Sequence, residues 1–293
     1  MSNYTIIENC RTDARLRSMF FDFTRTIYPN VDFVEWYTRG FWQDEYTPHV
    51  IVDNDLIVAN VSATRMKLTV NDHEIRGVQI GTVGTVPEYR GRGLSRLLME
   101  HIIDKYQDSS DLLFLFANSD VLDFYTKFGF VQYYASLFKT TSAVPPPAFS
   151  ARQLSIHSRS DMTLLQSLLQ DRTILTSRFG AIDYAFVTQW HILNIFSNDL
   201  FYVEKEDAVI IARERDESMH VYDVICRNPI DPVQSLAYVM KSPEARSIVW
   251  YFPPDQLHFD FDETPADDNC PQFVRGDFAV ADGKFKFPTT AQT

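Results

Sequence analysis

The sequence predicts an α/β (α+β) fold in which a mixed central sheet carries helices on its faces. Three observations support this prediction. Strand patterns alternate with amphipathic helical patterns between residues 5 and 138, a similar order of elements returns after residue 151, and 45% of the residues are hydrophobic. At 293 residues the chain is longer than one average domain, so we expect two domains.

The elements of the first half follow from local patterns. Apolar residues at helical spacing, such as Leu16 and Phe20, predict the helix at 13–27, and a second short helix is expected at 32–39. Asp-Asn-Asp and Asn-Asp turns delimit the strands at 49–53, 56–69 and 74–86. A strand at 5–7, a helix at 93–106, a strand at 112–117, a helix at 119–127 and a strand at 131–138 complete the sheet.

Three consecutive prolines at 145–147 indicate a stiff linker between two domains. After it we expect a helix at 161–169, strands at 201–204, 207–212 and 219–224, a helix at 231–240 and a strand at 247–252. This order repeats the strand–strand–strand–helix–strand order of the first half. The predicted division is therefore a domain at 1–142, a linker at 143–150 and a domain at 151–293. The segment 277–293 is left open between paired strands and a surface position.

The most informative segment runs from Gly81 to Ser95, where a strand ends near Pro87 and an amphipathic helix begins near Gly93. Arginine and glycine alternate over residues 90–93. Glycines let a bulky anion approach the backbone N–H groups at a helix start, and the positive end of the helix dipole points to the same place. Arginine side chains can add charge-assisted hydrogen bonds. This turn therefore predicts the binding of a phosphate or pyrophosphate.

Two common phosphate loops are excluded. A dinucleotide fingerprint needs Gly-x-Gly-x-x-Gly, but Arg96 stands in the last position, and the Gly-Lys-Ser/Thr ending of a P-loop is absent. What remains is Arg90-x-x-Gly93-x-Ser95 directly after a strand. This pattern resembles the acyl-coenzyme A pyrophosphate loop of the GNAT superfamily of N-acetyltransferases. Gly or Ala is usual in the last position, and Ser95 is a small departure that keeps the approach open.

A second segment strengthens the resemblance. The apolar strand at 112–117 is followed by Asn118, and then by Phe124-Tyr125-Thr126-Lys127-Phe128-Gly129-Phe130. The latter looks like the later motif of the superfamily, in which a helix ends at glycine before the last strand. The resemblance covers roughly residues 4–140. The second half lacks an Arg-x-x-Gly-x-Gly equivalent, since residues 225–231 read Ile-Cys-Arg-Asn-Pro-Ile-Asp. We expect a second, degenerate GNAT-like domain there, as in the tandem-domain type of the superfamily.

The resemblance implies a cofactor site for acetyl-coenzyme A. The residues that match its cofactor-binding positions are Thr85, Val86, Arg90, Gly91, Arg92, Gly93, Leu94, Ser95 and Asn118. The alternatives are solvated loop charges for the two arginines and a helix cap for Asn118. Gly84 marks either a bulge that splays the strand or a tight packing contact. Six aromatic residues form either an acceptor wall, as in many relatives, or core: Phe33, Trp36, Tyr37, Phe41, Trp42 and Tyr46.

Tyr125 matches the tyrosine that often protonates the departing sulfur in this superfamily, the alternative being a core aromatic. A thiol titrates near ~8.5 and a tyrosine near ~10, so this transfer is uphill by about 2 kcal/mol, which makes a tyrosine acid feasible. No carboxylate stands at residues 76–81 of the strand before the turn, where many relatives carry a glutamate. His73, Glu74, His49 and Asp53 are weak candidates, and a water relay or a carboxylate from the second domain or tail is an equal alternative. We assign no base.

Bulk properties restrict the partners. A net charge of −12 disfavours nucleic acid, and the absence of a long apolar stretch or a leader-like start disfavours a membrane. Three widely spaced cysteines without metal spacing predict free thiols, no metal site and a cytoplasmic location. The expected function is transfer of an acetyl group from acetyl-coenzyme A to a primary amine of a small molecule or peptide. The alternative is a catalytically weak acyl-coenzyme A sensor. The sequence leaves a homo-oligomer open.

Overall fold

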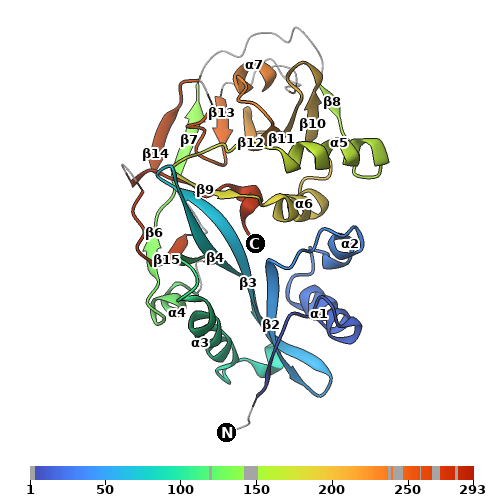
Figure 1. The fold of residues 1–293 in the computed structure, drawn as a ribbon, viewed down its shortest axis with the longest axis vertical. Helices are drawn as coiled ribbons and strands as arrows, with labels where there is room; N and C mark the ends of the chain where they lie inside the picture. Colours follow the sequence, from blue (N-terminus) through green and yellow to red (C-terminus); the bar gives the residue numbers. More distant parts are fainter. Residues whose placement is uncertain are drawn as a thin grey trace.

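The computed structural model describes residues 4–118, 121–141, 151–236, 239, 247–257, 259–265, 271–280 and 283–293. The predicted linker at 143–150 and Cys270 lie outside these residues, as does most of the second half of the predicted helix at 231–240. Two mixed sheets with helices on their faces make up the described part of the chain (Figure 1). The predicted fold class is confirmed.

The first sheet has the order β1-β2-β3-β4-β5-β15-β6, with β9 pairing an extension of β3. Its strands are β1 (Ile6–Glu8), β2 (Tyr46–Asp53), β3 (Leu56–Val70), β4 (His73–Thr85), β5 (Leu112–Phe116), β6 (Val131–Tyr133), β9 (Phe179–Ile182) and β15 (Gln272–Gly276). β4 and β5 run parallel, whereas β2, β3 and β4 form an antiparallel meander. The turns between these three strands use Asn and Asp residues with positive φ, as the sequence predicts.

Helices cover both faces of the first sheet (Figure 1). On one face lie α1 (Ala14–Ile27) and α2 (Phe33–Thr38), whose starts are capped by the side chains of Asp13 and Asp32. On the other lie α3 (Leu94–Tyr106) and α4 (Leu122–Thr126). α3 buries Leu98, Met99 and Ile102 against the sheet, at the spacing of one helical face. Gly129 has a φ of +78°, which fits the expected left-handed residue after α4.

The second sheet has the order β14-β7-β13-β12-β11-β10-β8. Its strands are β7 (Ser136–Thr140), β8 (Arg152–Gln153), β10 (Leu200–Val203), β11 (Ala208–Arg215), β12 (Ser218–Cys226), β13 (Ser247–Trp250) and β14 (Asp262–Pro265). Its helices are α5 (Arg159–Gln170), α6 (Ala185–Asn194) and α7 (Pro232–Leu236). β12 and β13 are parallel across α7, as β4 and β5 are across α3. The second sheet therefore fits a second GNAT-like domain.

The two sheets exchange strands. β7 leaves the first half and pairs with β13 and β14, whereas β15 leaves the second half and inserts between β5 and β6. The sequence expectation of one strand at 131–138 is wrong. The strand is interrupted at residues 134–135, and the chain continues as β7 in the other sheet. Each sheet therefore contains strands from both sides of the predicted linker, and the domain boundaries at 142 and 151 stay predictions. Pairing between strands from different halves of the chain depends on long-range contacts, which local periodicity does not encode.

The C-terminal segment is part of the interior. Phe285 and Phe287 are buried in the main hydrophobic cluster, and a short 3-10 helix follows at Thr289–Ala291. The last residue, Thr293, lies near the middle of the molecule beside β4 (Figure 1). Asp223 of β12 holds this segment, because it accepts a hydrogen bond from Thr290 Oγ1 at 2.6 Å and forms a buried ion pair with Arg172.

Two further expectations concern the cysteines and the membrane. Cys10 and Cys226 are free thiols, as predicted, and the structure shows that both are buried. Burial raises the pKa of both thiols, to about 12 for Cys10 and about 11 for Cys226. None of the described helices is long and apolar enough to cross a lipid bilayer.

Candidate active site

The site begins where two parallel strands of the first sheet separate. β4 pairs with β5 from Gly77↔Leu112 to Ile80↔Leu115, and the pairing then stops although β4 continues to Thr85. The backbone of Gly81 to Thr85 therefore has a free edge on the β5 side. A cavity of about 900 Å³ occupies this opening. An unpaired strand edge beside a cavity can accept an extended ligand that pairs with it like an additional strand.

A bulge at Thr82 produces the separation. Asn60 of β3 pairs with Gly84 and Ser62 pairs with Gly81, so Thr82 and Val83 oppose a single residue. Thr82 has a φ of +50°, a costly conformation for a β-branched residue. Two hydrogen bonds hold it: Asn60 Nδ2 donates to the Thr82 carbonyl at 2.7 Å, and the hydroxyls of Tyr46 and Thr82 lie 2.7 Å apart.

Gly84 does not form the bulge. A Cβ at this position would come within 3.0 Å of Ile27 and 3.2 Å of Phe23 on α1. The tight-packing alternative for Gly84 is therefore correct, and the bulge lies two residues earlier in the strand.

The arginine–glycine turn joins β4 to α3 and keeps the helix start open. Gly91 and Gly93 have φ values of +75° and +79°, and nothing lies within 4 Å of a Cβ built on either. Gly93 is the N-cap of α3, so no side chain caps the helix there. The first N–H groups of α3, at residues 94–96, precede the first donor of the helical ladder, Leu97, which bonds to Gly93. The turn thus presents free donors and open space for an anion.

The two arginines of the turn behave differently. Arg90 lines the cavity, and its Nε donates to the Thr85 carbonyl at 3.2 Å. Arg92 does not line it: its guanidinium lies 4.4 Å over the Tyr89 ring and donates to the Glu88 carbonyl. The expected phosphate contact of Arg92 stays a prediction, and in this arrangement its guanidinium is directed to Tyr89. Arg96, in the first turn of α3, lines the cavity instead, and the sequence interpretation overlooked it.

The remaining predicted cofactor residues converge on the same cavity, with one exception. Thr85, Leu94, Ser95 and Asn118 all line it, and the hydroxyls of Thr85 and Ser95 lie 2.9 Å apart. Val86 is the exception, because its N–H donates to the Val58 carbonyl of β3 at 3.0 Å. This backbone donor is used within the sheet, so pairing with a ligand falls to the residues of β4 before it.

Tyr125 stands at the wall of the cavity on α4. Its side chain is 5% exposed and packs against Phe124 and against Phe273 of β15. Burial raises the pKa of Tyr125 to about 12. A second phenol, Tyr28 at the end of α1, lines the cavity and donates to the Val83 carbonyl at 2.8 Å. Burial, together with the nearby Tyr125, raises the pKa of Tyr28 well above its usual value.

The weak base candidates from the sequence lie elsewhere. His49 is fully buried between β2 and α3, where burial lowers its pKa to about 4, and its Nε2 faces the Tyr106 hydroxyl. His73 and Glu74 are exposed at the far end of β4, and Asp53 accepts a hydrogen bond from Tyr89. None of these four lines the cavity. Among its described lining residues there is no Asp, Glu or His side chain.

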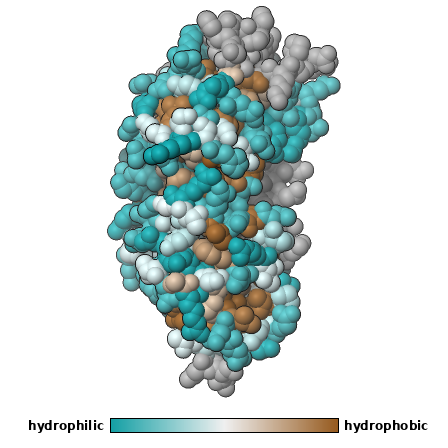
Figure 2. Space-filling model, turned by 90° about the vertical axis from the view of Figure 1, so that its right-hand side faces the viewer, coloured by the Kyte–Doolittle hydropathy of each residue, from teal (hydrophilic) through white to brown (hydrophobic). Residues whose placement is uncertain are grey.

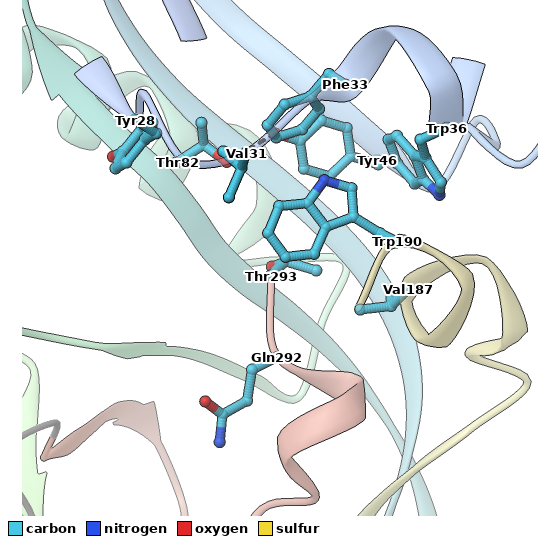
Figure 3. Close-up of a pocket in the computed structure, with 10 residues that line it drawn as sticks. All are labelled: Tyr28, Val31, Phe33, Trp36, Tyr46, Thr82, Val187, Trp190, Gln292 and Thr293. Atoms are coloured by element: carbon cyan, nitrogen blue, oxygen red, sulfur yellow. Dashed lines mark hydrogen bonds between the residues drawn. The ribbon is translucent and has the colours of Figure 1, made fainter. Parts of the chain in front are cut away.

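A smaller cavity of about 190 Å³ adjoins the first (Figure 3). Tyr28, Thr82 and Thr293 line both cavities. The other walls come from α2, β2 and α6. Phe33, Trp36 and Tyr46 take part, so three of the six sequence-predicted aromatic residues line a cavity and are core at once. Phe41 and Trp42 are buried core residues away from it, and Tyr37 packs at the edge of the same cluster.

Residues 17–132 match the family model of the acetyltransferase (GNAT) domain, which spans both the strand opening and the α4 motif. The chain contains a GNAT acetyltransferase domain. The start of α3 and the opening between β4 and β5 both lie inside this GNAT domain. No curated protein matches the chain significantly.

Solved structures support the fold over nearly the whole length. A probable N-acyltransferase from Enterococcus faecalis is 15% identical with a TM-score of 0.59, covering 92% of this chain and 72% of that one. Eis1 from Mycobacterium abscessus is 13% identical with a TM-score of 0.56, covering 92% and 73%. A GCN5-related N-acetyltransferase from Kribbella flavida is 15% identical with a TM-score of 0.54, covering 92% and 72%. At these identities the likeness establishes the fold of the GNAT domain and its companion sheet.

The sequence interpretation missed the residues that link the two cavities. Tyr28 carries no motif, Thr82 reads as an ordinary strand residue, and Thr293 lies more than two hundred positions away along the chain. A partial signal existed for Thr82, because the glycines at 81 and 84 on either side of it favour a local irregularity in the strand. No local signal places Thr293 beside β4.

Proposed function

We propose that the GNAT domain is an N-acetyltransferase that uses acetyl-coenzyme A and acetylates a primary amine of a small molecule or peptide. The observation that carries the proposal is the continuous cavity from the uncapped start of α3, along the free edge of β4, to Tyr125. A helix start with open glycines suits a pyrophosphate, and a free strand edge suits an extended pantetheine arm.

The binding roles follow from the geometry. The N–H groups of residues 94–96 would hold the pyrophosphate, and the exposed guanidinium groups of Arg90 and Arg96 would add charge-assisted hydrogen bonds. Gly91 and Gly93 leave space for the phosphates because a Cβ at either would project into the open region. Arg92 instead stiffens the turn through its contact with the Tyr89 ring.

Tyr125 is the proposed proton donor to the departing sulfur. With a pKa of about 12, complete transfer to a thiolate of pKa ~8.5 is uphill by ~3.5 units, or about 5 kcal/mol. This exceeds the ~2 kcal/mol that an unperturbed tyrosine would face. We therefore assign the phenol a hydrogen bond that strengthens as charge develops on the sulfur. The same high pKa keeps the phenol protonated throughout the neutral range.

The amine must lose a proton before it attacks. Neutralising an amine of pKa ~10.4 at pH 7 costs about 4.6 kcal/mol in water, and a buried site lowers this cost because desolvation disfavours the ammonium form. Since no described Asp, Glu or His side chain lines either cavity, we assign the proton to water. The smaller cavity lies beside the strand opening and gives the amine its approach to the thioester carbonyl.

Thiol release across a panel of amines tests this function, with coenzyme A binding measured in parallel by calorimetry. Turnover of at least one amine, together with a coenzyme A-dependent shift of the melting temperature, is the expected result. The lack of an Asp, Glu or His side chain among the described lining residues favours one alternative, a sensor that binds acyl-coenzyme A without turnover. Tight binding without release of thiol from any amine would favour the sensor, and no binding at all would reject both.

A further inference from the structure

The smaller cavity is walled chiefly by aromatic rings. Figure 3 shows Phe33, Trp36, Tyr46 and Trp190 gathered around it from α2, β2 and α6. The rings also pack on one another, with Phe33 and Trp190 centroids 5.7 Å apart and Phe33 and Tyr46 centroids 6.0 Å apart. Val31 and Val187 complete the apolar wall. Packed rings of this kind form a rigid surface that favours a flat or compact apolar group.

The polar groups of this cavity gather where it meets the cofactor cavity. Tyr28, Thr82 and Thr293 line both, and in Figure 3 Tyr28 and Thr82 are drawn at the end away from Trp36 and Val187. The side chain of Gln292 points away from the rings in the same view. A ligand with one polar end and an apolar body would therefore lie with its polar end toward the thioester.

Charge restricts the ligand further. No described residue that lines the smaller cavity is an Asp, Glu, Lys, Arg or His. A single ammonium group can remain at the polar end, beside hydroxyl groups, and can lose its proton there. A second or third ammonium group inside the aromatic part would have no described Asp or Glu side chain as a partner, which is strongly unfavourable. Aromatic faces compensate only a small part of that cost.

Size sets the upper limit. The cavity volume of about 190 Å³ is slightly larger than the roughly 150 Å³ of an engineered cavity that binds benzene. One aromatic ring with a short chain, or a branched alkyl group of similar volume, fills it. A sugar or peptide body is too large to be enclosed by these walls.

We propose that the acceptor is a primary amine with one positive charge and a compact apolar body, such as an arylalkylamine or a branched alkylamine. This inference rests on the proposed function. In the step, the neutral amine nitrogen forms a bond to the acetyl carbon and the carbon–sulfur bond breaks. The amine proton leaves to water, and the sulfur, which accepts a hydrogen bond from Tyr125, takes up a proton from water, so the products are the amide and free coenzyme A.

The test compares 2-phenylethylamine and 3-methylbutylamine with spermidine and kanamycin as acceptors for acetyl-coenzyme A. We expect kcat/KM for the two apolar amines to exceed that for the polycations by about 100-fold, because a buried unpaired charge is rejected strongly. Equal or higher kcat/KM for the polycations would overturn the inference while leaving acetyl transfer established.

Two variants of Val187 on α6 locate the binding site. Val187→Trp fills the cavity, so kcat/KM for 2-phenylethylamine should fall at least about tenfold while the Kd for coenzyme A is unchanged. The matched control is Val131→Trp, because Val131 is 57% exposed on β6 and lines neither cavity. Val187→Ala enlarges the cavity and should raise kcat/KM for 2-(1-naphthyl)ethylamine relative to 2-phenylethylamine. If Val187→Trp does not fold, the substrate preference of Val187→Ala tests the binding site instead. An unchanged preference between the two amines would refute the placement of the acceptor in the smaller cavity.

Calorimetric binding of 2-phenylethylamine in the presence of coenzyme A separates this inference from the proposed function. Binding that Val187→Trp abolishes supports the ligand class even if no acetyl group is transferred. Absence of both binding and turnover with every apolar amine rejects the class, whether or not other amines react.

Discussion

Replacing Gly93 with aspartate places a carboxylate at the uncapped start of α3, where the pyrophosphate is proposed to bind. The fold should tolerate the change. Nothing lies within 4 Å of a Cβ at this position, and the backbone strain at a φ of +79° costs about 1 kcal/mol, since Asp is among the residues that best accept this conformation. The helix dipole stabilises a carboxylate at this position by roughly 0.5 kcal/mol, which offsets part of the strain.

The affinity for coenzyme A should fall much more than the stability of the fold. A phosphate resting on the N–H groups of the first turn would lie about 5 Å from the new carboxylate, and at an effective dielectric constant of 20 the repulsion is about 3 kcal/mol. That corresponds to a loss of about 100-fold or more in affinity for coenzyme A. The loss should shrink as salt is added, because exposed charges are screened.

Gly93→Asn is the matched control, because it carries a similar side chain and backbone strain without charge. Calorimetry with coenzyme A gives the two affinities, and thermal unfolding shows whether both variants fold. We expect the two variants to have similar melting temperatures. The affinity for coenzyme A should fall modestly in Gly93→Asn and by a further factor of about 100 in Gly93→Asp. Equal affinities of the two variants would refute the placement of the pyrophosphate at this helix start.

Three further predictions concern a side chain at the reaction site and two buried charged or titratable groups. Tyr125→Phe should lower kcat, measured by thiol release, by about 100-fold and should change the Kd for coenzyme A, measured by calorimetry, less than twofold; an unchanged kcat removes the proposed role of the phenol. His191 is buried and its pKa is lowered to about 4 by burial, below the ~6.5 of the unfolded chain, so the unfolded state binds more protons between these values. The stabilisation from neutral His191 is present above about pH 6.5 and is lost as the pH falls through about 4, where the loss reaches about 3 kcal/mol. Urea unfolding at pH 7 and pH 4.5 should therefore show a smaller loss of stability at the lower pH in His191→Gln than in the unsubstituted protein. Arg172→Met leaves the carboxylate of Asp223 buried and unpaired and should cost about 3–5 kcal/mol by urea unfolding, most of it regained in the double variant with Asp223→Leu; a loss below 1 kcal/mol would contradict this.

Local patterns located most elements of the first half of the chain to within a few residues. The strand at 56–69 is observed at Leu56–Val70, and the helix at 93–106 is observed at Leu94–Tyr106. These elements are specified by spacing of apolar residues, by turn residues and by glycine, all of which act over a few positions. Two elements of the second half, the strand β9 and the helix α6, were not predicted. Residues 179–194 are mostly buried, so their apolar residues show no clear period.

The sequence alone predicted the position of the candidate site. An arginine–glycine turn between a strand and a helix exposes backbone donors through local geometry, so the proposal of an anion site follows from a local pattern. Most of the matching residues do line one cavity. The details of single side chains were not determined: Arg92 stacks on Tyr89 and the N–H of Val86 bonds within the sheet. Such contacts depend on the path of the loop in three dimensions.

Only the tertiary structure decided what surrounds that turn. β15 enters the first sheet beside β5, and the segment after it brings Thr293 to the backbone of Gly81. Thr82, Tyr28 and Thr293 become neighbours although they are far apart along the chain, and the aromatic cavity opens between α2 and α6. The physical reason is that strand pairing and cavity walls depend on contacts between distant segments, whose register is selected by the packing of the whole core and carries no local signature in the sequence.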